Sequence, residues 1–131
     1  MKLFIRTFGC QMNVHDSLRI ADIMRLHGFT LTDVPTDADV IVVNSCTVRD
    51  KASHKAISEA GRMCTYKRRN PNLVVVMVGC LAEQEGDKLL KPIPSLDLMI
   101  GPDHYGELPS LVQDVIADRL QGRAVTGFDE G

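Results

Sequence analysis

Aromatic side chains are scarce in this sequence, and tryptophan is absent. Phe, Tyr and Trp together make up 5% of the 131 residues. Proteins that bind single-stranded nucleic acid without sequence preference usually stack the bases on several aromatic rings. The composition therefore argues against a stacking platform for single-stranded nucleic acid.

The sequence also lacks an excess of charge of either sign. It carries 15 Lys and Arg side chains against 17 Asp and Glu, which gives a formal net charge of −2. A strong positive field, which draws proteins to nucleic-acid phosphates, is therefore missing. We expect no DNA partner, and any contact with RNA has to be local or made by another part of a longer protein.

No apolar run is long enough to cross a membrane, and the longest runs, 40–43 and 73–78, end at a polar residue or a glycine. The first six residues lack the apolar segment and cleavage site of a secretion signal. The sequence thus predicts a cytoplasmic protein with no membrane partner. In that reducing compartment, its four cysteines are more typical of thiols or metal ligands than of disulfides.

Short apolar runs alternate with segments of helical periodicity, and the apolar content of 44% is enough for one core. Runs 40–43 and 73–78 are apolar at every position, which is typical of strands covered by helices on both faces. The pattern predicts an α/β fold with an open parallel sheet, flavodoxin-like or Rossmann-like. The expected strands are 3–8, 40–43, 73–78 and 98–100, and the expected helices lie within 16–26, 50–69, 83–91 and 108–120.

We expect a strand order of about 2-1-3-4, with segment 3–8 between 40–43 and 73–78, and a short extended segment at 30–34. Asp16 or Ser17 is expected to cap the first helix, and Gly28 to end it in the left-handed conformation. Residues 1–121 are expected to form one domain, and residues 122–131 a linker or tail.

Three cysteines occupy equivalent places in three successive units. Cys10, Cys46 and Cys80 each follow an expected strand and precede a helix-like stretch. Ligands of such sheets bind beyond the carboxyl ends of the strands, and neighbouring strands are about 4.8 Å apart. The three sulfurs are therefore expected within roughly 5 to 10 Å of one another. Three soft ligands without an obvious fourth favour a metal centre with one open position, and an iron-sulfur cluster fits best.

Other interpretations of these cysteines stay open. Buried free thiols are common. A zinc-stabilised interaction module would take four ligands, usually in close pairs, although His15 or His54 is available as the fourth. A flavodoxin-like module for a flavin or nucleotide would need a first turn rich in Gly, Ser or Thr, and residues 10–14 contain none of these.

Cys64 differs from the other three cysteines, because it falls inside the expected second helix and away from any strand end. We expect it to serve packing. The basic run 67–69 follows it. Its positive charges are favourable at the negative end of the helix dipole, so we interpret this run as a solvated helix end and not as a binding site for RNA phosphate.

Segments 7–13, 44–49 and 78–80 together resemble the amino-terminal domain of the radical-SAM methylthiotransferases. The likeness covers nearly the whole chain, including 38–40 and the Gly101-Pro102 turn. The residues after the first cysteine are most similar to tRNA enzymes of the MiaB type, which methylthiolate an isopentenyl-modified adenosine beside the anticodon. Relatives that act on threonylcarbamoyl adenosine or on a ribosomal protein are the alternative.

The resemblance implies that Cys10, Cys46 and Cys80 hold an auxiliary [4Fe-4S] cluster whose open iron carries the sulfur or methylthio group. Asn13 follows the first of these ligands and is either a hydrogen-bond donor to the cluster or a helix cap. Asn44 and Ser45 are expected to orient the turn at Cys46. Gly9 and Gly79 are expected to give the cluster room.

The family's C-x₃-C-x₂-C motif, which holds a second [4Fe-4S] cluster that binds S-adenosylmethionine, does not occur in this sequence. The resemblance therefore implies a fragment of a longer enzyme, with no catalytic residue of its own and no activity alone. Its expected partners are the radical-SAM and RNA-binding domains of the same full-length chain, and tRNA through those domains.

Overall fold

The computed structural model describes residues 1–8, 11–45, 50–70, 72–79, 88–89, 91, 93, 95–117 and 123–125. For residues 11–13, 50–54, 102–103 and 123–125 it describes only the backbone.

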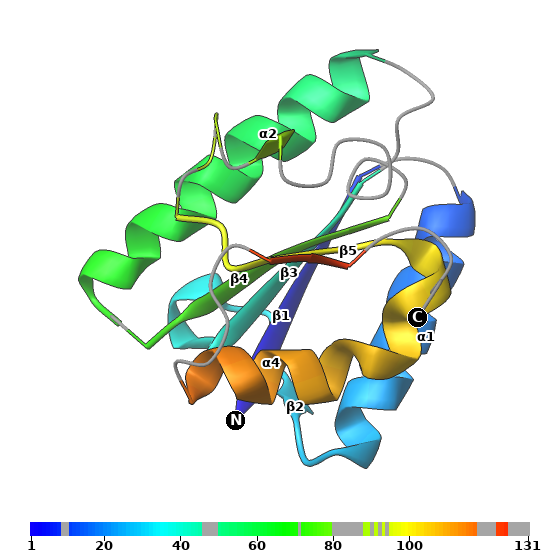
Figure 1. Ribbon diagram of the computed structural model, residues 1–131, viewed down its shortest axis with the longest axis vertical. Coiled ribbons are helices and arrows are strands. Elements are labelled where there is room, and N and C mark those ends of the chain that lie inside the picture. The colour runs from blue at the N-terminus through cyan, green and yellow to red at the C-terminus, as the bar shows by residue number, and fades with distance from the viewer. Residues whose placement is uncertain are drawn as a thin grey trace.

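A parallel sheet forms the centre of the molecule (Figure 1). In the described part of the chain it has six strands in the order β2-β1-β3-β4-β5-β6, and every neighbouring pair is parallel. The strands are β1 (Lys2–Thr7), β2 (Thr30–Leu31), β3 (Val40–Ser45), β4 (Val74–Gly79), β5 (Leu98–Ile100) and β6 (Arg123–Val125). The predicted open α/β sheet is therefore confirmed.

The predicted order 2-1-3-4 is confirmed for the strands numbered along the chain. The second of these strands, however, is Thr30–Leu31 and not the predicted segment 40–43. The prediction that segment 40–43 lies on the other side of the first strand is wrong, because this segment belongs to β3, between β1 and β4. The short, exposed β2 occupies the place next to β1 instead. β1, β3 and β4 are consequently three consecutive strands.

Helices cover both faces of the sheet (Figure 1). On one face, α1 (Gln11–Leu26) and α4 (Leu108–Ile116) pack through Ile20, Met24, Leu108 and Val112. On the other face lies α2 (Asp50–Cys64), which packs through its small residues and Met63. The described chain also contains the short 3₁₀ helices η1 (Pro35–Asp37), η2 (Thr65–Arg68) and η4 (Pro102–Glu107).

The two cores follow from the alternation of side chains along each strand. In β3, Val40 and Val42 contribute to the core under α1 and α4, whereas Ile41 and Val43 contribute to the core under α2. All four are completely buried. This explains why the run is apolar at every position, as the sequence indicated.

The first helix begins earlier than predicted. α1 starts at Gln11, so Asp16 and Ser17 lie in its second turn and neither caps it. Its end at Leu26 agrees with the prediction, and Gly28 has a φ of +92°, the left-handed conformation expected there. Beyond it, Phe29 N–H donates to the carbonyl oxygen of Met24 at 3.1 Å.

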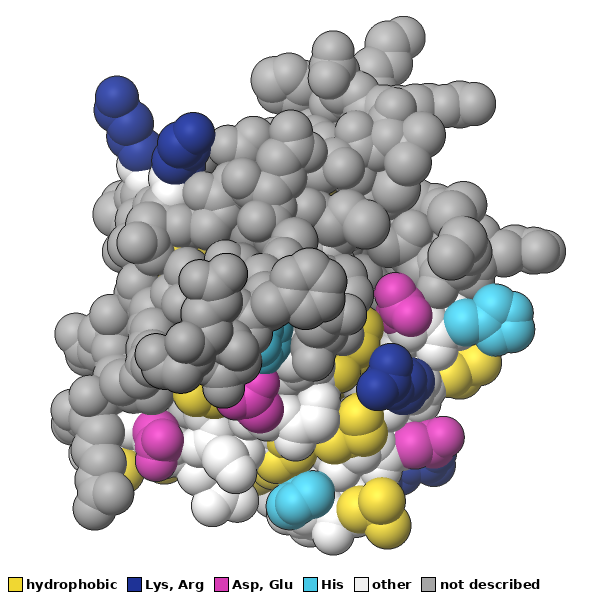
Figure 2. Space-filling view, turned by 45° about the vertical axis from the view of Figure 1, so that its right-hand side comes forward, with side chains coloured by type: hydrophobic (Ala, Val, Ile, Leu, Met, Phe, Trp, Pro, Cys, Tyr) yellow, Lys and Arg dark blue, Asp and Glu magenta, His cyan; other side chains and the backbone are white. Residues whose placement is uncertain are grey.

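The outer face of α1 is mixed in character. Leu18 and Leu26 are apolar, yet they are 60% and 84% exposed. Figure 2 shows this side of the molecule, where hydrophobic, acidic, basic and histidine side chains alternate over the described part of the surface. Side chains of different kinds are mixed on this described surface, which holds no large patch of one kind.

The last predicted helix before β5 and the predicted tail differ in how much of them the structure describes. The helix expected within 83–91 lies almost wholly outside the described residues. Arg123–Val125 pairs with β5 as strand β6, so three residues of the segment expected to be a linker or tail belong to the sheet.

Candidate metal centre at the carboxyl edge of the sheet

The strands that precede the three cysteines end side by side. Thr7 of β1 pairs with Asn44 of β3, and Ser45 of β3 pairs with Gly79 of β4. Phe8 N–H extends the first pairing by donating to the carbonyl oxygen of Asn44 at 2.8 Å. The described chain therefore brings the approaches to the three predicted ligands to one edge of the sheet.

The predicted ligands Cys10, Cys46 and Cys80 lie outside the described residues, as do Gly9 and the side chain of Asn13. The backbone of Asn13 is the third residue of α1, inside the helix and not at its cap. The predicted ligand set and the predicted role of Asn13 therefore stay predictions.

Gly79 is required by the structure for a reason that the sequence did not show. Its φ of +99° is a conformation that L side chains rarely adopt. A Cβ on this residue would lie 2.3 Å from the carbonyl oxygen of Ser45 and 2.8 Å from Oδ1 of Asn44. Both distances are shorter than those that Cβ atoms show in proteins, so the neighbouring atoms would have to shift. The backbones of β3 and β4 thus meet closely just before Cys46 and Cys80.

Ser45 holds its own strand end to β4. Its side chain is fully buried, and Oγ donates to the carbonyl oxygen of Val78 at 3.2 Å and lies 3.3 Å from Sδ of Met77. A buried hydroxyl is costly unless it is hydrogen-bonded. Ser45 is therefore a specific tie between the two strand ends and not a surface residue at a turn.

A second polar contact joins three elements at the same edge. Ser17 Oγ of α1 lies 2.6 Å from Oγ1 of Thr7 in β1 and accepts a hydrogen bond from Nδ2 of Asn44 in β3 at 2.9 Å. Asn44 is fully buried. The sequence indicated Asp16 or Ser17 as a helix cap and suggested no role of its own for Thr7. The available signal was three polar residues beside otherwise apolar strands.

The loop after β5 reaches this edge as well. His104 of η4 is 8% exposed, and its Nδ1 contacts the Glu107 carboxylate. The Arg19 guanidinium of α1 lies 6.0 Å from the centre of the buried Tyr105 ring. The Arg19–Tyr105 contact joins η4 to α1, whereas the His104–Glu107 contact lies within η4. From the sequence, only the Gly101-Pro102 turn that starts this loop had been singled out.

Cys64 lies at the opposite edge of the sheet. It is the last residue of α2, a helix whose 15 residues span about 22 Å. Burial raises the pKa of its thiol from 9.0 to about 11, with nearby Lys67 opposing and Asp97 reinforcing the shift. The thiol packs against the core under α2. This agrees with the prediction that Cys64 serves packing.

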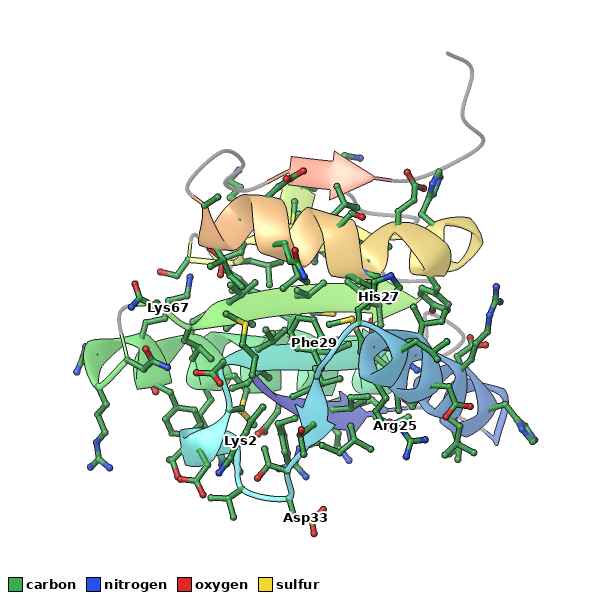
Figure 3. All side chains as sticks on the ribbon, turned by 90° about the horizontal axis from the view of Figure 1, so that it is seen from below. Lys2, Arg25, His27, Phe29, Asp33 and Lys67 are labelled. Carbon is green, nitrogen blue, oxygen red and sulfur yellow. The ribbon has the colours of Figure 1, made fainter. Side chains whose placement is uncertain are left out.

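The basic run beside Cys64 is partly engaged in internal contacts. Lys67 Nζ lies 2.7 Å from Oδ2 of Asp97 and donates to the carbonyl oxygen of Ser95 at 2.6 Å. Figure 3, seen from below the view of Figure 1, shows Lys67 and Lys2 at this amino edge. The best-buried cation of the run is therefore already paired, which supports its interpretation as a helix end.

Neither a rival metal site nor a membrane span appears among the described residues. No three His, Cys, Asp or Glu side chains there come together as a metal site requires. His15, one of the two possible zinc ligands, is exposed, and the side chain of His54 is outside the description. No helix there is both long and apolar enough to cross a membrane.

The fold and the strand ends define an α/β domain in whose sequence three strands are followed by cysteines. Comparison with known proteins identifies its family. The model of the "Uncharacterized protein family UPF0004" matches residues 2–101, and the chain belongs to this family. The resemblance to the amino-terminal domain of the methylthiotransferases is likewise confirmed by curated relatives.

Three of these relatives share the name tRNA-2-methylthio-N(6)-dimethylallyladenosine synthase. The Sorangium cellulosum protein is 49% identical over 111 residues, which are 85% of this chain and 22% of the relative. The Bordetella parapertussis protein is 50% identical over 113 residues, 86% of this chain and 24% of the relative. A Cereibacter sphaeroides protein is 42% identical over 123 residues, 94% of this chain and 27% of the relative. The chain spans about a quarter of the length of these relatives.

Proposed function

We propose that this chain is the cluster-binding domain of a tRNA methylthiotransferase that acts on isopentenyl-modified, that is dimethylallyl, adenosine beside the anticodon. In this proposal Cys10, Cys46 and Cys80 hold an auxiliary [4Fe-4S] cluster. The observation that carries it is the pairing of Thr7 with Asn44 and of Ser45 with Gly79 at one edge of the sheet. The names of the relatives support the choice of adenosine derivative.

The residues of this edge fit such a group in their chemistry. Cys46 and Cys80 are bonded directly to the paired residues Ser45 and Gly79, and Cys10 follows Phe8 by two positions. Adjacent strands are about 4.8 Å apart, and consecutive Cα atoms about 3.8 Å, so three thiolates are within reach of one cubane. Three thiolates are a soft donor set typical of iron-sulfur clusters.

When bound, the cluster would supply an iron with an exchangeable position for the sulfur or methylthio group. The chain's own residues then have two tasks. Ser45 and Gly79 hold the strand ends before Cys46 and Cys80 at close approach. The fully buried Val43, Met77 and Val78 exclude water from beneath that edge. Asn13 is proposed to donate a hydrogen bond toward the cluster, since its backbone lies in the first turn of α1.

The remaining steps belong to parts beyond this domain. We propose that a radical-SAM domain with a second [4Fe-4S] cluster and S-adenosylmethionine, together with an RNA-binding domain, completes the enzyme in the cytoplasm and contacts tRNA. The share of the relatives' length that lies outside the match supports such domains. The chain alone is not expected to transfer a methylthio group, and its proposed domain is residues 1–121 extended by strand β6.

The group that the chain binds decides between this function and its rivals. The chain should be reconstituted anaerobically with ferrous iron and sulfide, and separately with zinc and with flavin mononucleotide, and then freed of excess reagent. We expect iron and inorganic sulfide to be retained in equal amounts. Retention of zinc alone would favour a structural zinc module, and retention of flavin alone would favour a flavodoxin-like carrier. Either result would contradict the proposal.

A further inference from the structure

Three side chains from three different elements meet at the hydroxyl of Ser17. Its Oγ lies 2.6 Å from Thr7 Oγ1 and 2.9 Å from Asn44 Nδ2. Thr7 is ten residues away from Ser17 in sequence, and Asn44 is 27 residues away. One hydroxyl therefore joins the ends of β1 and β3 to α1.

The donors and acceptors of this contact are consistent with one another. The Asn44 amide nitrogen has only hydrogens to offer, so Ser17 accepts that bond. A serine hydroxyl has one hydrogen and two acceptor positions, so Ser17 is still able to donate to Thr7 or to accept from it. The Ser17 oxygen thus takes part in two hydrogen bonds at once, and alanine would remove both of them.

The connection continues from Asn44 to the next strand. Oδ1 of Asn44 faces β4, because a Cβ placed on Gly79 would lie 2.8 Å from it. Hydrogen bonds thus connect Thr7, Ser17 and Asn44, and the Asn44 side chain lies beside Gly79, so the arrangement spans β1, α1, β3 and β4. These are the three strands whose ends lead to the cysteines, together with the helix that follows the first cysteine.

Packing alone does not account for these residue types. The neighbouring strand positions Val42, Val43 and Val78 are apolar and fully buried, and a polar side chain among them is costly unless it is hydrogen-bonded. Asn44 is just as fully buried, yet it is polar. Its amide bonds directionally to a helix, which valine would not do. Such directional bonds set the relative position of strand and helix more narrowly than apolar contact does.

We propose that Ser17 is a positioning residue for the iron-sulfur cluster, acting through Thr7 and Asn44 on the strand ends that carry Cys10 and Cys46. This inference rests on the proposed function. In this proposal, the Ser17 hydroxyl fixes the distance between the ends of β1 and β3, which precede the ligands Cys10 and Cys46. Loss of the hydroxyl lets that spacing vary, so the cluster is held less tightly and its electronic environment changes. Groups that orient metal ligands typically affect metal affinity about 10- to 100-fold.

The test compares Ser17→Ala, Ser17→Thr and Thr65→Val with the parent chain, each reconstituted anaerobically with iron and sulfide. Thr65→Val is the matched control, since Thr65 Oγ1 donates to the Arg62 carbonyl oxygen at 2.6 Å at the opposite edge of the sheet. Two properties are measured: the rate at which a ferrous chelator removes iron, and the electron paramagnetic resonance spectrum of the reduced cluster. Circular dichroism of the metal-free chains reports folding.

We expect Ser17→Ala to bind a cluster that loses iron about 10- to 100-fold faster than the parent and shows a shifted resonance spectrum. Ser17→Thr should restore both properties because it keeps the hydroxyl, and Thr65→Val should match the parent. A Ser17→Ala cluster with the parent's rate and spectrum would overturn the positioning role while leaving the proposed function intact.

A variant that fails to fold and a parent chain that fails to bind iron have different consequences. If Ser17→Ala does not fold, Thr7→Val, which removes one of the two bonds to Ser17, is judged by the same two measurements. A parent chain that retains no iron and sulfide would instead overturn the proposed function, and the positioning role with it. The two failures are therefore distinguishable.

Discussion

Ser45 and Gly79 are paired at the last residues that β3 and β4 contribute to the sheet, and they approach each other so closely that only glycine fits at position 79. Each is followed directly by a cysteine in the sequence. The backbones of β3 and β4 thus approach each other closely at the carboxyl edge of the sheet, where we propose that the cluster binds.

Replacing Gly79 with alanine should destabilise the chain by about 2 kcal/mol or more. The left-handed conformation alone costs an L residue about 1 to 2 kcal/mol. The new Cβ would in addition lie 2.3 Å from the Ser45 carbonyl oxygen, a backbone atom that cannot move alone. Urea denaturation followed by circular dichroism gives the free energy of unfolding.

Gly61 offers the matched control for that measurement. It lies inside α2, and nothing comes within 4 Å of the Cβ position. Gly61→Ala should therefore raise the free energy of unfolding by about 0.5 to 1 kcal/mol, as expected for a helix interior. Equal effects of the two substitutions would show that the close approach at Gly79 has no energetic weight.

Cys64 should be an unreactive thiol at neutral pH. Because burial raises its pKa to about 11, the reactive thiolate is scarce until the solution becomes strongly alkaline. Alkylation at Cys64, followed by peptide mass spectrometry, should still accelerate between pH 9 and 11. A rate that levels off near pH 9 would mean that the thiol is not desolvated.

The same raised pKa has a consequence for stability. The folded chain holds the Cys64 proton more tightly than the unfolded chain does, so this contribution to stability is complete below pH 9 and is lost as the pH rises toward 11. Cys64→Ser lacks a group that titrates in this range. Its free energy of unfolding should decline less between pH 9 and 11 than that of the parent chain.

The strands of the sheet were the most predictable part of the molecule. Runs such as Val40–Val43 are buried on both faces, and this leaves a direct mark in the sequence. Their order was harder, because β2 has only two exposed residues and little hydrophobic signal. The start of α1 at Gln11 was missed for a similar reason, since polar residues and the half-exposed Val14 hide the helical period.

The proposed ligands of the candidate site could be named from the sequence, but the contacts that support the strand ends could not. Three cysteines at equivalent positions are visible in the sequence. The contact of Ser17 with Asn44 is not, because it joins residues 27 positions apart and depends on how α1 packs on the sheet. The positive φ of Gly79 depends likewise on the backbone of the neighbouring strand.

The central claim is that three cysteines, and not the fourth, hold the cluster. Iron and sulfide content after anaerobic reconstitution should be measured for Cys10→Ala, Cys46→Ala, Cys80→Ala and Cys64→Ala beside the parent chain. The account predicts that each of the first three loses the cluster and that Cys64→Ala retains the parent's full content. Loss of the cluster in Cys64→Ala, or its retention in any of the other three variants, would contradict the account.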